Sequence, residues 1–132
     1  MNKHFSVRYQ HDYEAAVIDA TGRLTHGEAD CQLRDLMQDL LGRGYRRLLM
    51  NLSGATYLDS SALGALIAAQ RGAQDAGGEL KLVNLSPRAS DLLQLTKLYV
   101  VFAVYKDEQS ALASFGPKPT PPRIPPSLPH AA

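Results

Sequence analysis

The chain has 132 residues, which is enough for one domain and leaves little room for a second. Hydrophobic residues make up 45% of it and charged residues 20%, an ordinary globular usage that excludes wholesale disorder or a fibre. Lys and Arg number 14 against 13 Asp and Glu, so the chain lacks the basic excess typical of nucleic-acid-binding proteins. We therefore expect no nucleic-acid partner.

The single cysteine, Cys31, allows no intramolecular disulfide and no cysteine cluster for a metal, which favours a reducing compartment. The segment Met1–Gln10 is polar and charged, unlike a signal peptide. No apolar run approaches the roughly 18 residues that a membrane span needs. We therefore expect a cytoplasmic protein with no membrane segment, metal or cofactor.

Proline is concentrated at one end of the chain. Seven of the eight prolines lie in residues 116–132, a stretch that contains no acidic residue. A segment of this composition cannot form a packed core and is typical of an extended, solvated tail. We expect one folded domain over residues 1–115 and a disordered, Pro-rich tail over residues 116–132.

The first half of the chain predicts three strands. Apolar and polar residues alternate over residues 5–10, which is typical of a half-exposed strand. Residues 15–20 form a second, weaker strand signal that ends at Thr21-Gly22. The short apolar run over residues 48–52 shows no alternation, which predicts a strand covered on both faces, and residues 53–56 read as a loop after it.

A helix is predicted between the second and third of these strands. Thr25 and Glu28 have the spacing of a capping box that opens a helix, and Gly42 and Gly44 end it. Its apolar side chains recur at helical spacing on one face, at Leu33, Leu36, Met37 and Leu40. The polar residues Asp30, Arg34, Asp35 and Gln38 are expected to face away from the core.

The second half predicts alternating helices and strands, which occupy residues 62–76 (helix), 80–83 (strand), 87–97 (helix), 99–105 (strand) and 108–115 (helix). Gly77-Gly78 ends the first of these helices, and Ser86-Pro87 starts the second with a capping hydroxyl and a proline at its first position. Strands that alternate with helices require crossover connections. We therefore expect an α/β fold with a mostly parallel sheet of four to five strands, an antiparallel edge strand and about four helices.

No catalytic constellation emerges from the sequence. The Gly-Lys-Ser/Thr of a phosphate-binding loop is absent, and residues 59–62 lack the flanking glycines of a nucleophile elbow. A serine nucleophile also needs a nearby base, and the four histidines are scattered along the chain. These absences favour a protein that is not an enzyme.

The segment Asp59-Ser60-Ser61 lies where a parallel strand gives way to a helix, the place where α/β proteins put their ligand sites. Two interpretations are open. In one, Ser60 only caps the helix, contributing roughly 1 kcal/mol, and Asp59 favours the positive helix end. In the other, the segment is a binding site, because capping needs one hydroxyl and the following helix exposes small residues.

At these residues the chain resembles the STAS domain of bacterial anti-sigma factor antagonists. The stretch over residues 48–66 has that family's apolar strand, short loop, aromatic–apolar pair and Asp-Ser-Ser before a helix. Residues 21–24 resemble its Gly-x-Leu turn, residues 77–80 its Gly-Gly turn, and Ser86-Pro87 its third helix start. The resemblance covers roughly residues 5–115 and implies the STAS fold.

The resemblance also implies a regulatory function. In the family, an anti-sigma factor that is an ATP-dependent serine kinase phosphorylates the first serine after the aspartate, and a serine phosphatase removes the phosphate. The unphosphorylated form binds the anti-sigma factor. Here the acceptor is Ser60, with Ser61 as the alternative, and the implied partner-binding residues are Asp59, Ser60, Ser61, Ala62, Gly64, Gly22, Arg23 and Thr25.

Two positions depart from the family pattern: Ala62 replaces a usual glycine, and Thr25 stands where an acidic residue is common. Two other functions are compatible with the sequence. One is a STAS scaffold subunit of a transport or sensory assembly that is never phosphorylated; the other is a small enzyme with Ser60 as nucleophile, which lacks an evident base. We expect a free monomer, because each predicted helix has one apolar stripe and the sheet covers it.

Overall fold

The structure, a computed structural model, describes residues 4–25, 27–97 and 100–116. Five strands form one sheet in the order β1-β2-β3-β4-β5. β1 is antiparallel to β2, and the other neighbouring pairs are parallel, which confirms the expected α/β sheet with an antiparallel edge. The strands are β1 (Phe5–Gln10), β2 (Ala15–Leu24), β3 (Arg47–Leu58), β4 (Glu79–Val83) and β5 (Val104–Tyr105).

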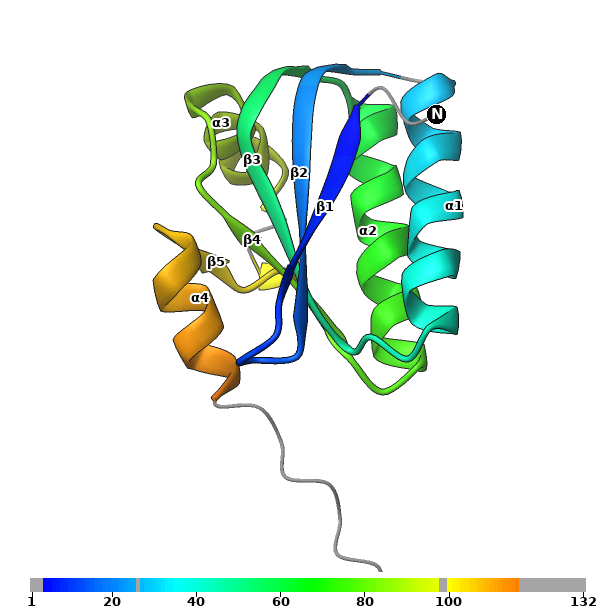
Figure 1. The fold of residues 1–132 in the computed structure, drawn as a ribbon. Helices are drawn as coiled ribbons and strands as arrows, with labels where there is room; N and C mark the ends of the chain where they lie inside the picture. Colours follow the sequence, from blue (N-terminus) through cyan, green and yellow to red (C-terminus); the bar gives the residue numbers. More distant parts are fainter. Residues whose placement is uncertain (1–3, 26, 98–99, 117–132) are drawn as a thin grey trace, which may run out of the picture.

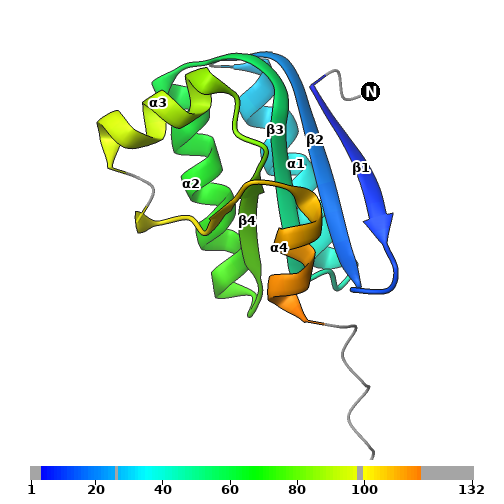
Figure 2. The same ribbon diagram turned by 90° about the vertical axis from the view of Figure 1, so that its left-hand side faces the viewer.

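Helices cover both faces of the sheet. They are α1 (Glu28–Gly42), α2 (Ser60–Asp75), α3 (Pro87–Thr96) and α4 (Glu108–Phe115). Figure 1 shows α1 and α2 side by side on one face, with α4 on the other and α3 near the end of β3. In Figure 2, α4 stands in front of the sheet and α2 behind it. Because α1, α2 and α3 each follow a parallel strand, all three begin at the carboxyl-terminal edge of the sheet.

Strand alternation sorts the apolar side chains into two cores. Ile18 and Met50 belong to the larger core, which α1 and α2 cover, whereas Val17 and Leu49 belong to the smaller one beneath α4. All four are fully buried, so β2 and β3 are covered on both faces. This confirms the interpretation of the apolar run over residues 48–52.

The central strands extend further than their sequence indicates. Thr21-Gly22 does not end β2, and residues 53–56 are not a loop, because β2 and β3 remain paired up to Leu24 and Leu58. The pairing is irregular there, with a register shift after Asp19 and another after Gly22. Gly22 has φ +81°, which a glycine adopts without steric cost, so the residues that suggested turns form bulges in a continuous ladder.

The predicted capping box of α1 is wrong by two residues. The N-cap is Gly27 rather than Thr25, and the Gly27 N–H donates to Asp30 Oδ2 at 3.4 Å. Asp30 therefore does not face away from the fold as expected. By contrast, Ser86 does cap α3, since its Oγ accepts the Ala89 N–H at 3.2 Å.

The strand predicted over residues 99–105 is also wrong in length. Of the described residues in that segment, Val104 and Tyr105 alone form a strand, β5, which pairs with β4. Residues 100–103 lie outside the strand, and Phe102 among them belongs to the main core. The β-branched side chain of Val100 favoured a strand in the sequence, but this residue is 75% exposed and does not belong to one. Residue 99 and the tail over residues 117–132 lie outside the described residues.

The end of α2 is the predicted Gly-Gly cap. The Gly78 N–H donates to Ala73 O at 2.7 Å and the Gly77 N–H to Gln74 O at 2.9 Å, the pair of bonds that defines a Schellman motif. A Cβ on Gly78 would lie 2.3 Å from the backbone oxygen of Arg46. The helix end is therefore pressed directly against the start of β3.

We predict that Gly78→Ala lowers the free energy of unfolding by about 1–3 kcal/mol, because backbone must move to admit the methyl group. Gly72→Ala is the matched control, since no atom lies within 4 Å of its added Cβ and alanine is the better helix former. Urea unfolding of both variants measures the effect. Equal free energies of unfolding for the two variants would contradict the close approach of Gly78 to the Arg46 backbone.

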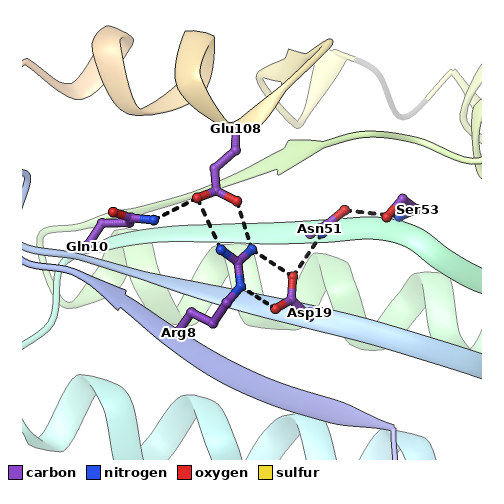
Figure 3. Close-up of polar contacts among 6 residues, drawn as sticks. All are labelled: Arg8, Gln10, Asp19, Asn51, Ser53 and Glu108. Carbon is purple, nitrogen blue, oxygen red and sulfur yellow. Dashed lines mark hydrogen bonds and ion pairs between the residues drawn. The ribbon is translucent and has the colours of Figure 1, made fainter.

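Polar contacts attach the short helix α4, which buries only Ala111 and Leu112. Arg8 Nε donates to Asp19 Oδ2 at 2.6 Å, and its Nη2 donates to Glu108 Oε1 at 2.7 Å (Figure 3). Asn51 Nδ2 adds a bond to Asp19 Oδ1 at 2.8 Å. The hydrogen bonds from Arg8 hold the pKa of the Asp19 carboxyl below its ordinary value, against the opposing effect of burial.

A buried lysine supports the same helix. Lys81 is 6% exposed, and its Nζ donates to Ser114 Oγ at 2.6 Å while lying 4.1 Å from the ring centroid of Phe115. The ring of Tyr105 lies on the ammonium as well, at 5.2 Å. Hydrogen bonding and cation–π contact thus offset part of the desolvation cost of this cation.

We predict an acid-sensitive contribution from Asp19. Because its pKa is lowered on folding from the ordinary 3.8, the stabilisation is fully present above that pH and is lost as the pH falls through the folded-state pKa. Urea unfolding at about pH 7 and about pH 3 should therefore show a smaller acid-induced loss of stability in Asp19→Asn than in the wild type. The same loss in both proteins would show that the network in Figure 3 contributes nothing.

Candidate functional site

Asp59 forms the junction between β3 and α2. Its backbone is extended, with φ −102° and ψ 177°, and its Oδ1 accepts the Ala62 N–H at 2.8 Å. Its own N–H donates to Leu24 O at 3.3 Å, which ties the junction to the end of β2. The N-cap of α2 is therefore Asp59, and the interpretation of Ser60 as the capping residue is wrong.

The two serines that follow occupy different environments. Ser60 is the first residue of α2 and its side chain is exposed. Ser61 is half-buried, and its Oγ donates to Asp30 Oδ2 of α1 at 2.8 Å. The Ser60 hydroxyl thus lies at the solvent-exposed start of the helix, while the Ser61 hydroxyl forms a hydrogen bond between α2 and α1.

The remaining predicted site residues gather at the same edge of the sheet. Gly22 and Arg23 lie beside Ala55 and Tyr57 in the paired ladder that leads to Asp59. Thr25 follows at the end of β2 and is half-buried. On α2, Gly64 is exposed whereas Ala62 is 5% exposed, so Ala62 offers a partner almost no surface.

A groove runs between α1 and α2 from the Ser61–Asp30 contact. Its volume is about 360 Å³ and its walls are mostly apolar or small side chains. They include Leu33, Met37, Leu41, Ala65, Ala68, Ala69 and Gly72. The small-chained helix surface expected from the sequence is therefore present, and it faces α1 along this groove.

Sequence reasoning did not include three residues of this edge among the predicted site residues. Asp30 lies three residues before Leu33 and seven before Met37, so its position on the inward stripe of α1 was readable from the spacing. The ring of Tyr57 contacts two arginines: Arg23 Cζ lies 4.8 Å from the ring centroid and Arg88 Cζ lies 5.1 Å from it. Nothing in the local sequence joins Arg88 of α3 to Tyr57 of β3.

The described residues offer neither a metal site nor a membrane-spanning helix. Among residues 4–25, 27–97 and 100–116, His, Cys, Asp and Glu side chains form no group of three or more that could hold a metal ion. In the same part of the chain, every helix is too short or too polar to cross a bilayer.

Comparison with known proteins identifies the family. The STAS domain model matches residues 6–111, so the chain belongs to the STAS domain family, as the sequence motifs indicated. Over 106 residues the chain is 22% identical to a Paenibacillus polymyxa protein named anti-sigma F factor antagonist, a match that covers 80% of this chain and 91% of that protein.

Solved structures share the fold. A crystal structure of an anti-sigma factor antagonist from Mycobacterium paratuberculosis aligns with a TM-score of 0.73 at 20% identity, over 84% of this chain and 92% of that one. The Bacillus cell fate determinant SpoIIAA in its phosphorylated form aligns with a TM-score of 0.62 at 23% identity, over 80% and 95% of the two chains. At these identities the likeness establishes the STAS fold alone.

We predict that removing the two side chains at the start of α2 has unequal effects on stability. Asp59→Ala deletes the N-cap acceptor and should lower the free energy of unfolding by about 0.5–2 kcal/mol. Ser60→Ala removes an exposed hydroxyl and should change it by about 0.5 kcal/mol or less. Urea unfolding compares them, with Asp59→Asn as the control that keeps a capping oxygen. A larger loss in Ser60→Ala would contradict the assignment of the cap.

Proposed function

We propose that the protein is a cytoplasmic anti-sigma factor antagonist controlled by phosphorylation of Ser60, and that it acts by binding and not as an enzyme. The observation that carries the proposal is the exposed hydroxyl of Ser60 at the first position of α2, beside a cap that Asp59 already supplies. The hydroxyl is accessible to a kinase and is not needed to start the helix. The name of the Paenibacillus polymyxa relative supports the same class.

A phosphate on Ser60 is compatible with the fold. It adds about −1.5 to −2 charges, and the helix dipole favours an anion at the helix start. The side chain already points to solvent, so the phosphate displaces no buried group. Modification therefore changes the charge of the surface and leaves the packing of α2 intact.

The same phosphate prevents partner binding. An anti-sigma factor that docks over a neutral Ser60 would meet a dianion next to the Asp59 carboxylate, with acceptor oxygens that it cannot satisfy. The partner surface comprises Asp59, Ser60, Ser61, Gly64, Gly22, Arg23 and Thr25, with Ala62 beneath it. A serine phosphatase restores the binding-competent form, which is a monomer when free.

Ser61 is the poorer acceptor. Its hydroxyl is half-buried and bonded to Asp30, so a phosphate there would place two charges within a few ångströms of a carboxylate. It would also occupy the mouth of the groove between α1 and α2. Charge and access thus both favour Ser60 over its neighbour.

We predict that an anti-sigma factor kinase of the source organism, supplied with ATP, phosphorylates the wild type and Ser61→Ala on Ser60 and leaves Ser60→Ala unmodified. Ser60→Ala should still bind the kinase, since its surface stays neutral, whereas Ser60→Asp should bind it about tenfold or more weakly. Mass spectrometry locates the phosphate and calorimetry gives the affinities. Ser110→Ala is the matched control, because Ser110 also lies in a first helical turn capped by an aspartate.

The opposite pattern would contradict the proposal in one of two ways. If Ser60→Ala takes up phosphate and Ser61→Ala does not, the acceptor is Ser61. Binding by all of these proteins, with no phosphate on any of them, would favour a STAS scaffold subunit of a transport or sensory assembly.

A further inference from the structure

Tyr57 makes cation–π contacts with two arginine side chains from different parts of the fold. Arg23 of β2 places its guanidinium carbon 4.8 Å from the ring centroid, and Arg88 of α3 places its own at 5.1 Å. Arg23 and Tyr57 are cross-strand neighbours in the parallel ladder. We call these three residues the Arg–Tyr–Arg stack. It joins β2, β3 and α3 at the edge of the sheet where α2 also begins.

The two charges of the stack are not neutralised by the described part of the chain. Among those residues, neither Arg23 nor Arg88 has a carboxylate within ion-pair distance, and both side chains are exposed. Arg8 and Arg43 differ, since they pair with carboxylates of Asp19 and Asp39. The stack therefore concentrates two free positive charges in a chain whose formal charge is only +1.

Stacking prepares these guanidinium groups to bind an anion. The Tyr57 ring attracts each guanidinium by a cation–π contact, and among the described residues no acceptor takes a hydrogen bond from either group, so their N–H donors remain available. A carboxylate can take two such donors at once, in the plane of the group. Contact with Tyr57 also restricts the arginine side chains, which lowers the conformational entropy lost when a partner binds.

We infer that the Arg–Tyr–Arg stack recognises an acidic segment of the partner protein, with Asp or Glu side chains placed against Arg23 and Arg88. The inference rests on the proposed function and assigns charge to the anti-sigma factor surface that faces this edge. A protein carboxylate fits better than a nucleic acid, because two cations in a chain with a formal charge of +1 fall short of the basic stripe that nucleic-acid binding requires. The stack would thus select among partners by charge.

The first test uses a soluble probe and needs no known partner. Titration of the isotope-labelled protein with hexaglutamate should shift the side-chain Nε–Hε resonances of Arg23 and Arg88, and leave that of Arg71, an exposed arginine of α2, unchanged. Arg23→Gln/Arg88→Gln should abolish the binding. Equal shifts at Arg71, or stronger binding of an oligonucleotide than of hexaglutamate, would overturn the inference.

The second test uses the anti-sigma factor kinase that the wild type binds. Arg23→Glu/Arg88→Glu should weaken the complex by about tenfold or more, and Arg71→Glu, with the same type of charge change, should leave it unchanged. Added salt should weaken the wild-type complex more than that of the double variant. Unchanged affinity in the double variant, with Ser60 still phosphorylated, would overturn the inferred role of the stack and leave the proposed function intact. A wild type that binds no such kinase would refute the proposed function, and the hexaglutamate titration would still decide for or against the stack.

Discussion

The hydrogen bond from the Ala62 N–H to the Asp59 carboxylate, 2.8 Å long, sets the geometry of the candidate site. It begins α2 at Ser60, and the following residue then falls about 100° further round the helix. Ser60 consequently faces solvent, while Ser61 faces α1 and reaches Asp30. If Ser60 were the cap, its hydroxyl oxygen would accept a backbone N–H of the first turn, and phosphorylation would change a contact that starts the helix.

This arrangement separates the residues that hold the fold from those that present its surface. The cap, the close approach of Gly78 to Arg46 and the two cores stabilise the layers without any contribution from the Ser60 hydroxyl. On the far face of the sheet, Arg8 and Lys81 use their charges to attach α4. Arg23 and Arg88 contact the ring of Tyr57 but pair with no carboxylate among the described residues, which leaves their charges available at the edge that the proposed partner covers.

Most of the fold could be predicted from the sequence because its signals are local. The buried run over residues 48–52, the Schellman cap after α2 and the Ser86-Pro87 start each depend on neighbouring residues alone. The continuation of β3 through residues 53–56 could not be predicted, because its pairing partner is β2. The Arg–Tyr–Arg stack could not be predicted for the same reason, because Tyr57 and Arg88 come into contact only when α3 packs near β3.

The central claim is that phosphorylation of Ser60 changes the surface and preserves the fold. Amide correlation spectra of the unphosphorylated and phosphorylated protein test it most directly, because each amide reports on its own surroundings. We predict that the resonances that move are confined to the start of α2 and the neighbouring ends of β2 and β3. Those of β4, α4 and the buried residues of both cores should stay in place. Shifts spread through the cores, or loss of the α2 resonances, would contradict the account, since the phosphate would then act by disrupting the fold.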